Sequence, residues 1–384
     1  MDFKQVYEYT NTAVKEVLGE TAVVNEDLSN IVDIGTAIFN ANALDKYVNA
    51  LVDHIGKVVF VDRVYRPKAP SVLMDGWTYG QVLEKIDGDL PEAVENESWN
   101  LTDGTSYDQN KFVKPNARAK FYSKRATFEV DLSITDLQAR GSFSSADQMG
   151  RFISMIYVKA ENAITLRLDK LILATIANQM AMTYHADIGA NTASEATGIK
   201  AINLLKLFND ATGAGATVAN CLQNLEFLKY ASYQILRASD HLTNYSKLFN
   251  VGGKEKFTPR DLQHIVLLSD FKRLSDVYLQ SDTFHNEFTK LPDATEVSYW
   301  QGSGTDFGID STAKIDVTTA DGNAVTIAHA IGTIFDRDAL GVCCIDRRVT
   351  SHYNAKAEFT NYFYKFDAGY FNDADENCVV FFIA

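Results

Sequence analysis

The stretch Ser144–Gln179, SSADQMGRFISMIYVKAENAITLRLDKLILATIANQ, decides the fold. Apolar side chains recur along it at helical spacing, no proline interrupts it, and Ser144, Ser145 and Asp147 can cap its first turn. A continuous helix here would be roughly 50 Å long, about three times the usual length. A coiled coil would keep a narrow apolar seam, whereas these apolar positions widen into LRLDKLILATIA. The pattern therefore predicts a long spine helix with strands and other helices packed along it.

The composition excludes several classes of protein. A chain of 384 residues that is 46% apolar and 22% charged is typical of a folded protein with two or three domains. The net charge of −14 disfavours binding to nucleic acid through phosphates, although a container whose wall faces DNA without binding it remains compatible. The four cysteines form no Cys-x-x-Cys pair, which favours reduced thiols in a cytoplasmic setting. We expect neither a signal peptide nor a membrane span.

Charges segregate along the region from Pro67 to about Arg125. Between Glu84 and Asp108 there are eight acids and one base, Lys85. Between Gln109 and Arg125 there are six bases and no acid. One interpretation is a solvated loop whose charges have no partner. The other is a long two-legged loop, acidic on the way out and basic on the return, that lies on a neighbouring copy with opposite charges setting the register.

The second interpretation names candidate residues for a subunit interface. They are the charged residues near the middle of each leg: Glu92, Glu95, Glu97, Lys111, Lys114, Arg118 and Lys120. Spacing alone leaves open whether the two legs pair within one loop or between subunits.

The other segments read as mixed helix and strand. KVVFVDRVYRP (Lys57–Pro67) and TFEVDLSI (Thr127–Ile134) are predicted strands, the second half-buried because its apolar residues alternate. Helix and strand patterns alternate between about 199 and 345, which indicates an inserted α/β domain. The C-terminal segments are nearly all β, and we expect CVVFFIA (378–384) to be a sheet strand packed on the spine helix, closing one domain around the insertion.

The sequence offers little chemistry. Asp306-Phe307-Gly308 lacks the other kinase motifs, and Gly213-Ala214-Gly215 follows a helix pattern and lacks a third glycine. His329 and His352 have no metal-site spacing. Three aspartates, Asp336, Asp338 and Asp346, are more simply explained by a capped turn than by a cation site. We therefore predict no catalytic residues, no cofactor and no metal, and expect that the protein is not an enzyme.

The arrangement of these segments resembles the major capsid protein of tailed bacteriophages, the Hong Kong 97-type fold that encapsulin shells share. HIVLLSDFKRLSDVYLQ (264–280) looks like the strand and helix of that family's axial domain. The segment from Gly332 to Ala384, with its DRDALG step before long strands, looks like the family's closing segment.

The resemblance implies an α+β capsid fold in five parts. These are an N-terminal arm (1–55), an extended loop with flanking strands (56–135), a peripheral domain with the spine helix (136–198), an axial domain (199–345) and the C-terminal strands of the peripheral domain (346–384).

It also implies a structural role in the virion. Copies would assemble in the host cytoplasm into pentamers and hexamers of an icosahedral shell around double-stranded DNA, without sequence-specific DNA binding and without a membrane. Separate scaffolding, portal and decoration proteins are possible partners. The alternatives are an encapsulin-type compartment, which typically has a shorter loop, another phage structural protein such as a tail component, and an uncharacterised enzyme in the 199–345 domain.

Overall fold

The structure is a computed structural model in which two compact units can be described. It describes residues 11–12, 14–16, 18–19, 33, 37, 63–64, 72–74, 82–110, 112–135, 146–189, 196–282, 294–301, 312–319 and 322–384. The first unit comprises Met1–Tyr65, Val130–Ala163 and Val349–Tyr364, and the second comprises Arg66–Glu129, Ile164–Arg348 and Lys365–Ala384. The predicted N-terminal arm and the strand predicted at 57–67 lie almost entirely outside the described residues.

The long helix predicted from the sequence is present as α5 (Ala146–Asp187), a single run of 42 residues. At 1.5 Å per residue it is about 63 Å long. Asp147 lies within the helix, not at its cap, and Ser144 and Ser145 are outside the described residues. The second half of α5 is the more buried, with Ile176 and Met180 fully enclosed. Burial of this half, more than local propensity, stabilises so long a helix.

A five-stranded sheet forms the centre of the second unit, in the order β5-β13-β10-β6-β7. Its strands are β5 (Ala201–Asn203), β6 (Gln263–Leu268), β7 (Thr295–Val297), β10 (Ala330–Asp336) and β13 (Cys378–Phe382). β10 pairs antiparallel with β13 and with β6, whereas β5 and β7 are parallel to their neighbours. Every residue of β10 and β13 is buried. Continuous apolar runs such as CVVFF are typical of strands covered on both faces.

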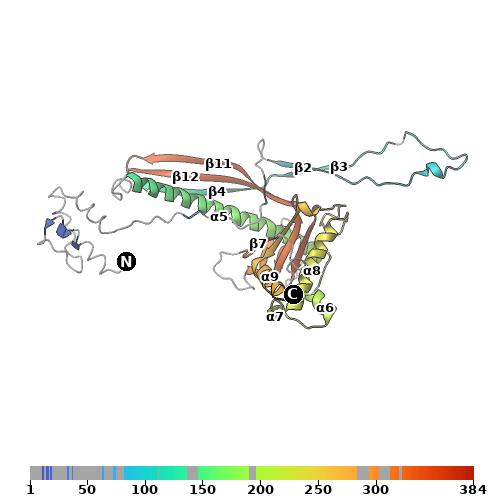
Figure 1. Ribbon diagram of the computed structural model, residues 1–384. Helices are drawn as coiled ribbons and strands as arrows, with labels where there is room; N and C mark the ends of the chain where they lie inside the picture. Colours follow the sequence, from blue (N-terminus) through green and yellow to red (C-terminus); the bar gives the residue numbers. More distant parts are fainter. Residues whose placement is uncertain are drawn as a thin grey trace. The chain divides into compact units, whose positions relative to one another are not determined.

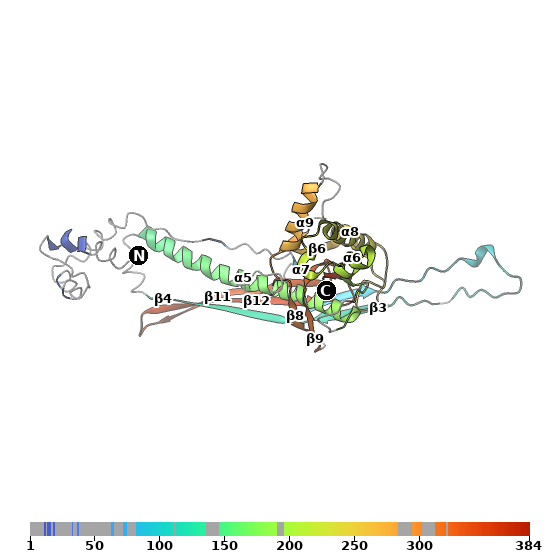
Figure 2. The same cartoon turned by 90° about the horizontal axis from the view of Figure 1, so that it is seen from below.

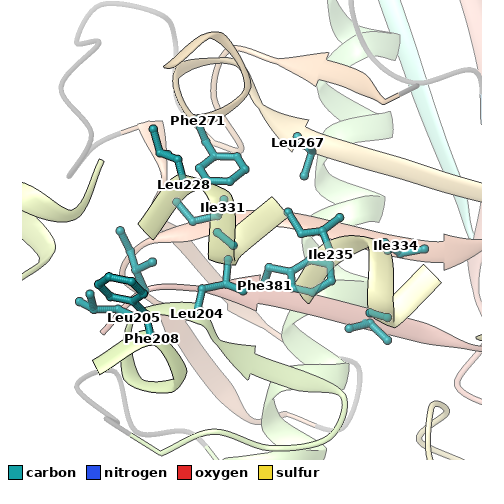
Figure 3. Packing of buried hydrophobic residues seen from close by; sticks show 14 of the residues in the cluster. Leu204, Leu205, Phe208, Leu228, Ile235, Leu267, Phe271, Ile331, Ile334 and Phe381 are labelled. Atoms are coloured by element: carbon teal, nitrogen blue, oxygen red, sulfur yellow. The ribbon is translucent and has the colours of Figure 1, made fainter. Parts of the chain in front are cut away.

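Helices cover one face of this sheet. They are α6 (Leu204–Thr212), α8 (Leu225–Leu242) and α9 (Ser269–Asp282), joined by the short helices α7 (Val218–Cys221) and η2 (Arg260–Leu262). Their buried residues form one apolar cluster with the strands, including Phe208, Phe227 and Phe271 against Ile334 and Phe381 (Figure 3). Asn203 and Asn224 cap α6 and α8 by accepting hydrogen bonds from backbone N–H groups of the first turn.

The C-terminal strand, β13, belongs to this sheet. As expected, β13 packs on α5, because the rings of Phe382 and Tyr184 meet edge-on with centroids 5.1 Å apart. Its hydrogen-bonded neighbours, however, are β10 and β5, which lie in the segment predicted to be a separate axial domain. A buried apolar strand reveals that it is covered on both faces but not which strand it pairs with. The division of the chain into the five predicted parts stays a prediction.

A second sheet has the strand order β1-β11-β12-β4. It contains β1 (Leu73–Met74), β4 (Arg125–Thr135), β11 (Leu340–Asn354) and β12 (Phe359–Asn372). The alternating exposure along β4 confirms the predicted half-buried strand. β8 (Ile315–Thr318) and β9 (Ala324–Ile327) form an antiparallel pair, and two further strands, β2 (Leu83–Gly88) and β3 (Ala117–Tyr122), form another. Among the described residues, none of the helices is long and apolar enough to cross a membrane.

The buried face of the five-stranded sheet gives a stability prediction. Phe381→Ala should lower the free energy of unfolding by about 3–5 kcal/mol, because it leaves a cavity among fully buried side chains. Urea unfolding of the purified chain, followed by circular dichroism, measures this change. Phe121→Ala is the matched control because Phe121 is 65% exposed. Equal losses for the two variants would contradict the assigned core.

Candidate assembly interface

The region predicted as a charged loop is a two-stranded hairpin with a long tip. β2 and β3 pair antiparallel from Leu83 opposite Tyr122 to Gly88 opposite Ala117. Residues 89–116, which we call the loop tip, extend beyond the paired strands and contain the 3-10 helix η1 (Glu97–Trp99). In both views the hairpin and its tip extend away from the five-stranded sheet of the same unit (Figures 1 and 2).

The register of the hairpin places two lysines directly opposite each other. Lys85 on β2 pairs with Lys120 on β3. Like charges at opposed positions normally destabilise a strand pair. Here both ammonium groups contact one carboxylate, that of Asp373, at 2.7 Å from Lys85 Nζ and 2.5 Å from Lys120 Nζ. The shared anion turns a repulsive pair into a bridged one.

The anion belongs to an acidic turn, Asp373–Glu376, that connects β12 to β13. Lys85 also pairs with Glu376 at 2.7 Å, and Lys120 with Asp375 at 2.7 Å. The side chain of Asp373 is only 2% exposed. Burial opposes its ionisation, but hydrogen bonds from Lys120 and Lys85 and from a backbone N–H outweigh that effect, so the pKa of Asp373 is lowered.

A third lysine, Lys256, completes the cluster. Lys256 pairs with Asp87 of β2 at 2.8 Å and with Glu376 at 3.2 Å. Burial lowers the pKa of Lys256, but its bonds to Asp87 and Glu376 outweigh that effect and raise it. We call the three lysines with Asp87 and the acidic turn the hairpin clamp.

The backbone around the acidic turn is tightly packed. The N–H groups of Val251 and Gly252 both donate to the carbonyl of Ala374, at 3.0 and 2.9 Å. A Cβ atom at Gly252 would overlap the Asp375 carboxylate, so a larger residue there would displace a carboxylate that pairs with Lys120. The acidic turn is therefore held by the backbone at Val251 and Gly252 as well as by the lysines of the hairpin.

The loop tip, in contrast, exposes large apolar side chains. Trp99 is 93% exposed, Phe112 84%, Val94 81% and Val113 75%. Exposed apolar side chains gathered on one segment indicate a surface that another molecule covers. The structure describes no such cover within this chain.

The seven predicted interface residues differ in whether they have an ion-pair partner in their own chain. Arg118 pairs with Asp89 at 2.7 Å within the loop, and Lys120 belongs to the hairpin clamp, so both have partners in their own chain. Glu92, Glu95 and Lys114 are exposed, and no ion pair joins them to another described residue. Two more predicted residues complete the set: Glu97 begins η1, and Lys111 lies outside the described residues.

Sequence reasoning missed the acidic turn and Lys256. A charge pattern read along the loop gives no sign of partners that lie far later in the chain. The alternation in LEKIDG, which puts Lys85 and Asp87 on one face of a strand, is the one local signal that an acidic and basic partner should face them.

No catalytic or metal site emerges from the described residues. Within the ranges described above, no group of three or more His, Cys, Asp or Glu side chains could hold a metal ion. The predicted capped turn is confirmed, since the Asp338 N–H donates to Asp336 Oδ1 at 2.9 Å. All four cysteines are free thiols.

Removing both hairpin lysines should destabilise the second unit strongly. Lys85→Met with Lys120→Met leaves Asp373 buried without a cation, which costs about 3–5 kcal/mol of unfolding free energy. Lys206→Met is the control, because its pair with Asp210 is exposed and contributes about 0.3–0.5 kcal/mol. Similar urea midpoints for the two variants would show that the clamp does not contribute.

The clamp should also make stability depend on pH. The pKa of Asp373 is lower in the folded chain than its ordinary value, so its contribution is present above that ordinary value and is lost as the pH falls through the folded pKa. Between pH 6 and pH 3 the wild type should lose more unfolding free energy than the Lys85→Met, Lys120→Met variant. Parallel pH curves would exclude Asp373 as the responsible group.

Comparison with solved structures identifies the fold. The chain is similar to one in the capsid structure of Staphylococcus phage Andhra, with 12% identity, a TM-score of 0.55, and coverage of 85% of this chain and 87% of that chain. A chain in the structure of head fiber and inner core protein gp22 of native bacteriophage P68 gives 10% identity, a TM-score of 0.54, and 85% and 87% coverage. For the capsid of Cyanophage P-SCSP1u the values are 12%, 0.50, 86% and 91%.

These similarities confirm the α+β, Hong Kong 97-type capsid fold expected from the sequence. No curated protein sequence matches the chain. The sequence profile of one family, described as Phi29-like phage major capsid protein, matches residues 10–382. Because that match spans nearly the whole chain, the protein belongs to the Phi29-like phage major capsid protein family.

Proposed function

We propose that this capsid protein forms pentamers and hexamers that enclose double-stranded phage DNA in an icosahedral head, and that its role is structural and not catalytic. The observation that carries the proposal is the loop tip, which exposes Trp99 and Phe112 beyond a hairpin clamped to its own unit. Fixed at its base and apolar at its end, such a loop suits contact with an adjacent copy.

The charge of the protein supports containment of DNA without tight binding. The net charge is −14, and binding DNA through its phosphates requires clustered cations. The lysines of the hairpin clamp are neutralised by their own chain. A wall of this kind leaves packaged DNA free to slide past it.

The proposal extends to the place of assembly and to other proteins of the particle. Assembly would take place in the host cytoplasm, with any scaffolding, portal or decoration proteins supplied as separate chains. The match to a phage capsid family does not favour the encapsulin alternative. An enzyme in the α/β layer would need reactive side chains that converge on one point. We find no such arrangement among the described residues.

Electron microscopy tests the proposed assembly directly. The protein expressed alone, or with the neighbouring genes of its phage, should form closed shells with five- and six-fold capsomers. A monodisperse monomer under all these conditions, together with turnover in a substrate screen, would overturn the proposal.

Changes in the loop tip should block assembly without unfolding the subunit. Trp99→Ser combined with Val94→Ser should reduce shell yield at least tenfold, because both side chains are exposed in the single chain and available to a neighbour. Their melting temperature should match that of the wild type. Val277→Ser, at a 63% exposed position on α9, is the control and should assemble normally. Normal shells from the loop variant would show that the tip is only a solvated surface.

A further inference from the structure

A groove beside the base of the hairpin has no role in the account so far. It has a volume of about 340 Å³ and lies between the end of β2, the segment 255–262 and the turn after β10. All of these segments belong to the second unit.

One side of the groove is an aromatic rim. The rings of Tyr245 and Phe257 lie with centroids 4.6 Å apart, although the two residues are 57% and 42% exposed. They flank an antiparallel bridge in which Ser246 and Lys256 exchange two backbone hydrogen bonds, of 3.0 and 3.2 Å. Leu90, 50% exposed, extends the apolar surface from the hairpin side. The aromatic rim is therefore already formed in the single chain.

The other side of the groove is acidic. Five acids line it against one base, Lys256: they are Asp87, Glu255, Asp336, Asp338 and Glu376. Burial raises the pKa of Asp336, hydrogen bonds oppose that effect, and the charges of Glu376 and Asp338 raise the pKa further. Asp338 is half exposed and its carboxylate lies 3.6 Å from Nε of Arg337, while Lys85 donates to the Asp338 carbonyl. Three further cations, Lys85, Lys247 and Arg337, pair with these acids from outside the groove. With Lys256 that makes four bases against five acids, so the groove keeps a net negative charge.

The return leg of the loop tip carries the complementary chemistry. Residues 112–115 read Phe-Val-Lys-Pro, and the residue before a proline favours extended backbone. In an extended segment Phe112 and Lys114 project to the same side. One apolar ring and one cation two residues apart match an aromatic rim beside an acidic wall.

This segment does not use the groove of its own chain. Phe112 is 84% exposed and Lys114 is exposed, so neither lies in a groove. The tip extends away from the five-stranded sheet beside which the groove lies (Figure 1).

We propose that the segment Phe112–Pro115 of one copy docks in this groove of a second copy, with Phe112 on the Tyr245–Phe257 rim and Lys114 beside Asp338. The proposal rests on the proposed assembly function and names its contact. Because the two docking surfaces differ, the contact is head-to-tail, the type that forms a ring when the rotation between copies closes.

Charge exchange tests the ionic half of the contact. Lys114→Glu and Asp338→Lys should each reduce shell yield about tenfold, and the double variant should recover most of the wild-type yield. Lys114→Glu with Asp316→Lys is the matched control, since Asp316 is an exposed acid on β8 outside the groove, and it should not recover. Circular dichroism and melting temperature establish that each subunit is folded. A charge-exchanged double variant no better than the single variants would overturn the contact.

Cross-linking tests the position and the number of chains. In a Cys344→Ser background, shells that contain both Val113→Cys and Tyr245→Cys chains should give disulfide-linked dimers after oxidation, whereas shells with either alone should not. Tyr233→Cys, on α8 outside the groove, replaces Tyr245→Cys in the control. Shells that form without the 113–245 dimer, or a bond within one chain when both cysteines are on it, would overturn this inference and leave the capsid function standing. Failure of the wild type to form shells would instead overturn the proposed function.

Discussion

The buried carboxylate of Asp373 is the charge on which the extended hairpin depends. At 2% exposure, it would cost several kcal/mol if left without a cation. Two lysines from facing strands approach it, and these lysines would repel each other if it were absent. The acidic turn and the hairpin therefore each remove an instability from the other. This mutual requirement joins the hairpin to the segment between β12 and β13, which leads directly into the central sheet.

Because the base of the hairpin is held by ion pairs, its exposed tip is attached to a fixed support. An apolar loop on a mobile support would lose much conformational entropy when it met a partner, and this loss weakens binding. Here only the 28 residues of the tip, 89–116, lie beyond the paired strands. The two ends of the hairpin therefore differ in chemistry: ion pairs hold the base, and large apolar side chains are exposed at the tip. Membership of a capsid family explains why a single chain leaves such side chains in water.

Local periodicity predicted the elements of this fold well, and long-range pairing poorly. The helix at 146–187 and the alternating strand at 125–135 follow from repeats of apolar residues that a short window detects. The same window detects CVVFF as a buried strand but cannot say that it pairs with β5 and β10. The pairing had to come from the structure, because the partners of this strand lie far away in the sequence.

The partners of charged residues in the candidate site were as hard to predict from the sequence as the strand pairing. Segregated acids and bases correctly marked residues 84–125 as unusual, yet Lys120 and Arg118 turn out to have partners in their own chain. Lys114 has none among the described residues and keeps its place as an interface candidate. Net charge along a segment does not reveal which charges are already satisfied, because that depends on carboxylates such as Glu376 that are distant in sequence.

The position of the acidic turn in the sequence has a consequence for synthesis. Residues 373–376 follow every described element except β13. A growing chain therefore makes the two opposed lysines long before it makes the anion that lets them face each other. The hairpin cannot take its final orientation until translation has passed the acidic turn. An unfinished chain therefore lacks the contact that holds the base of its hairpin.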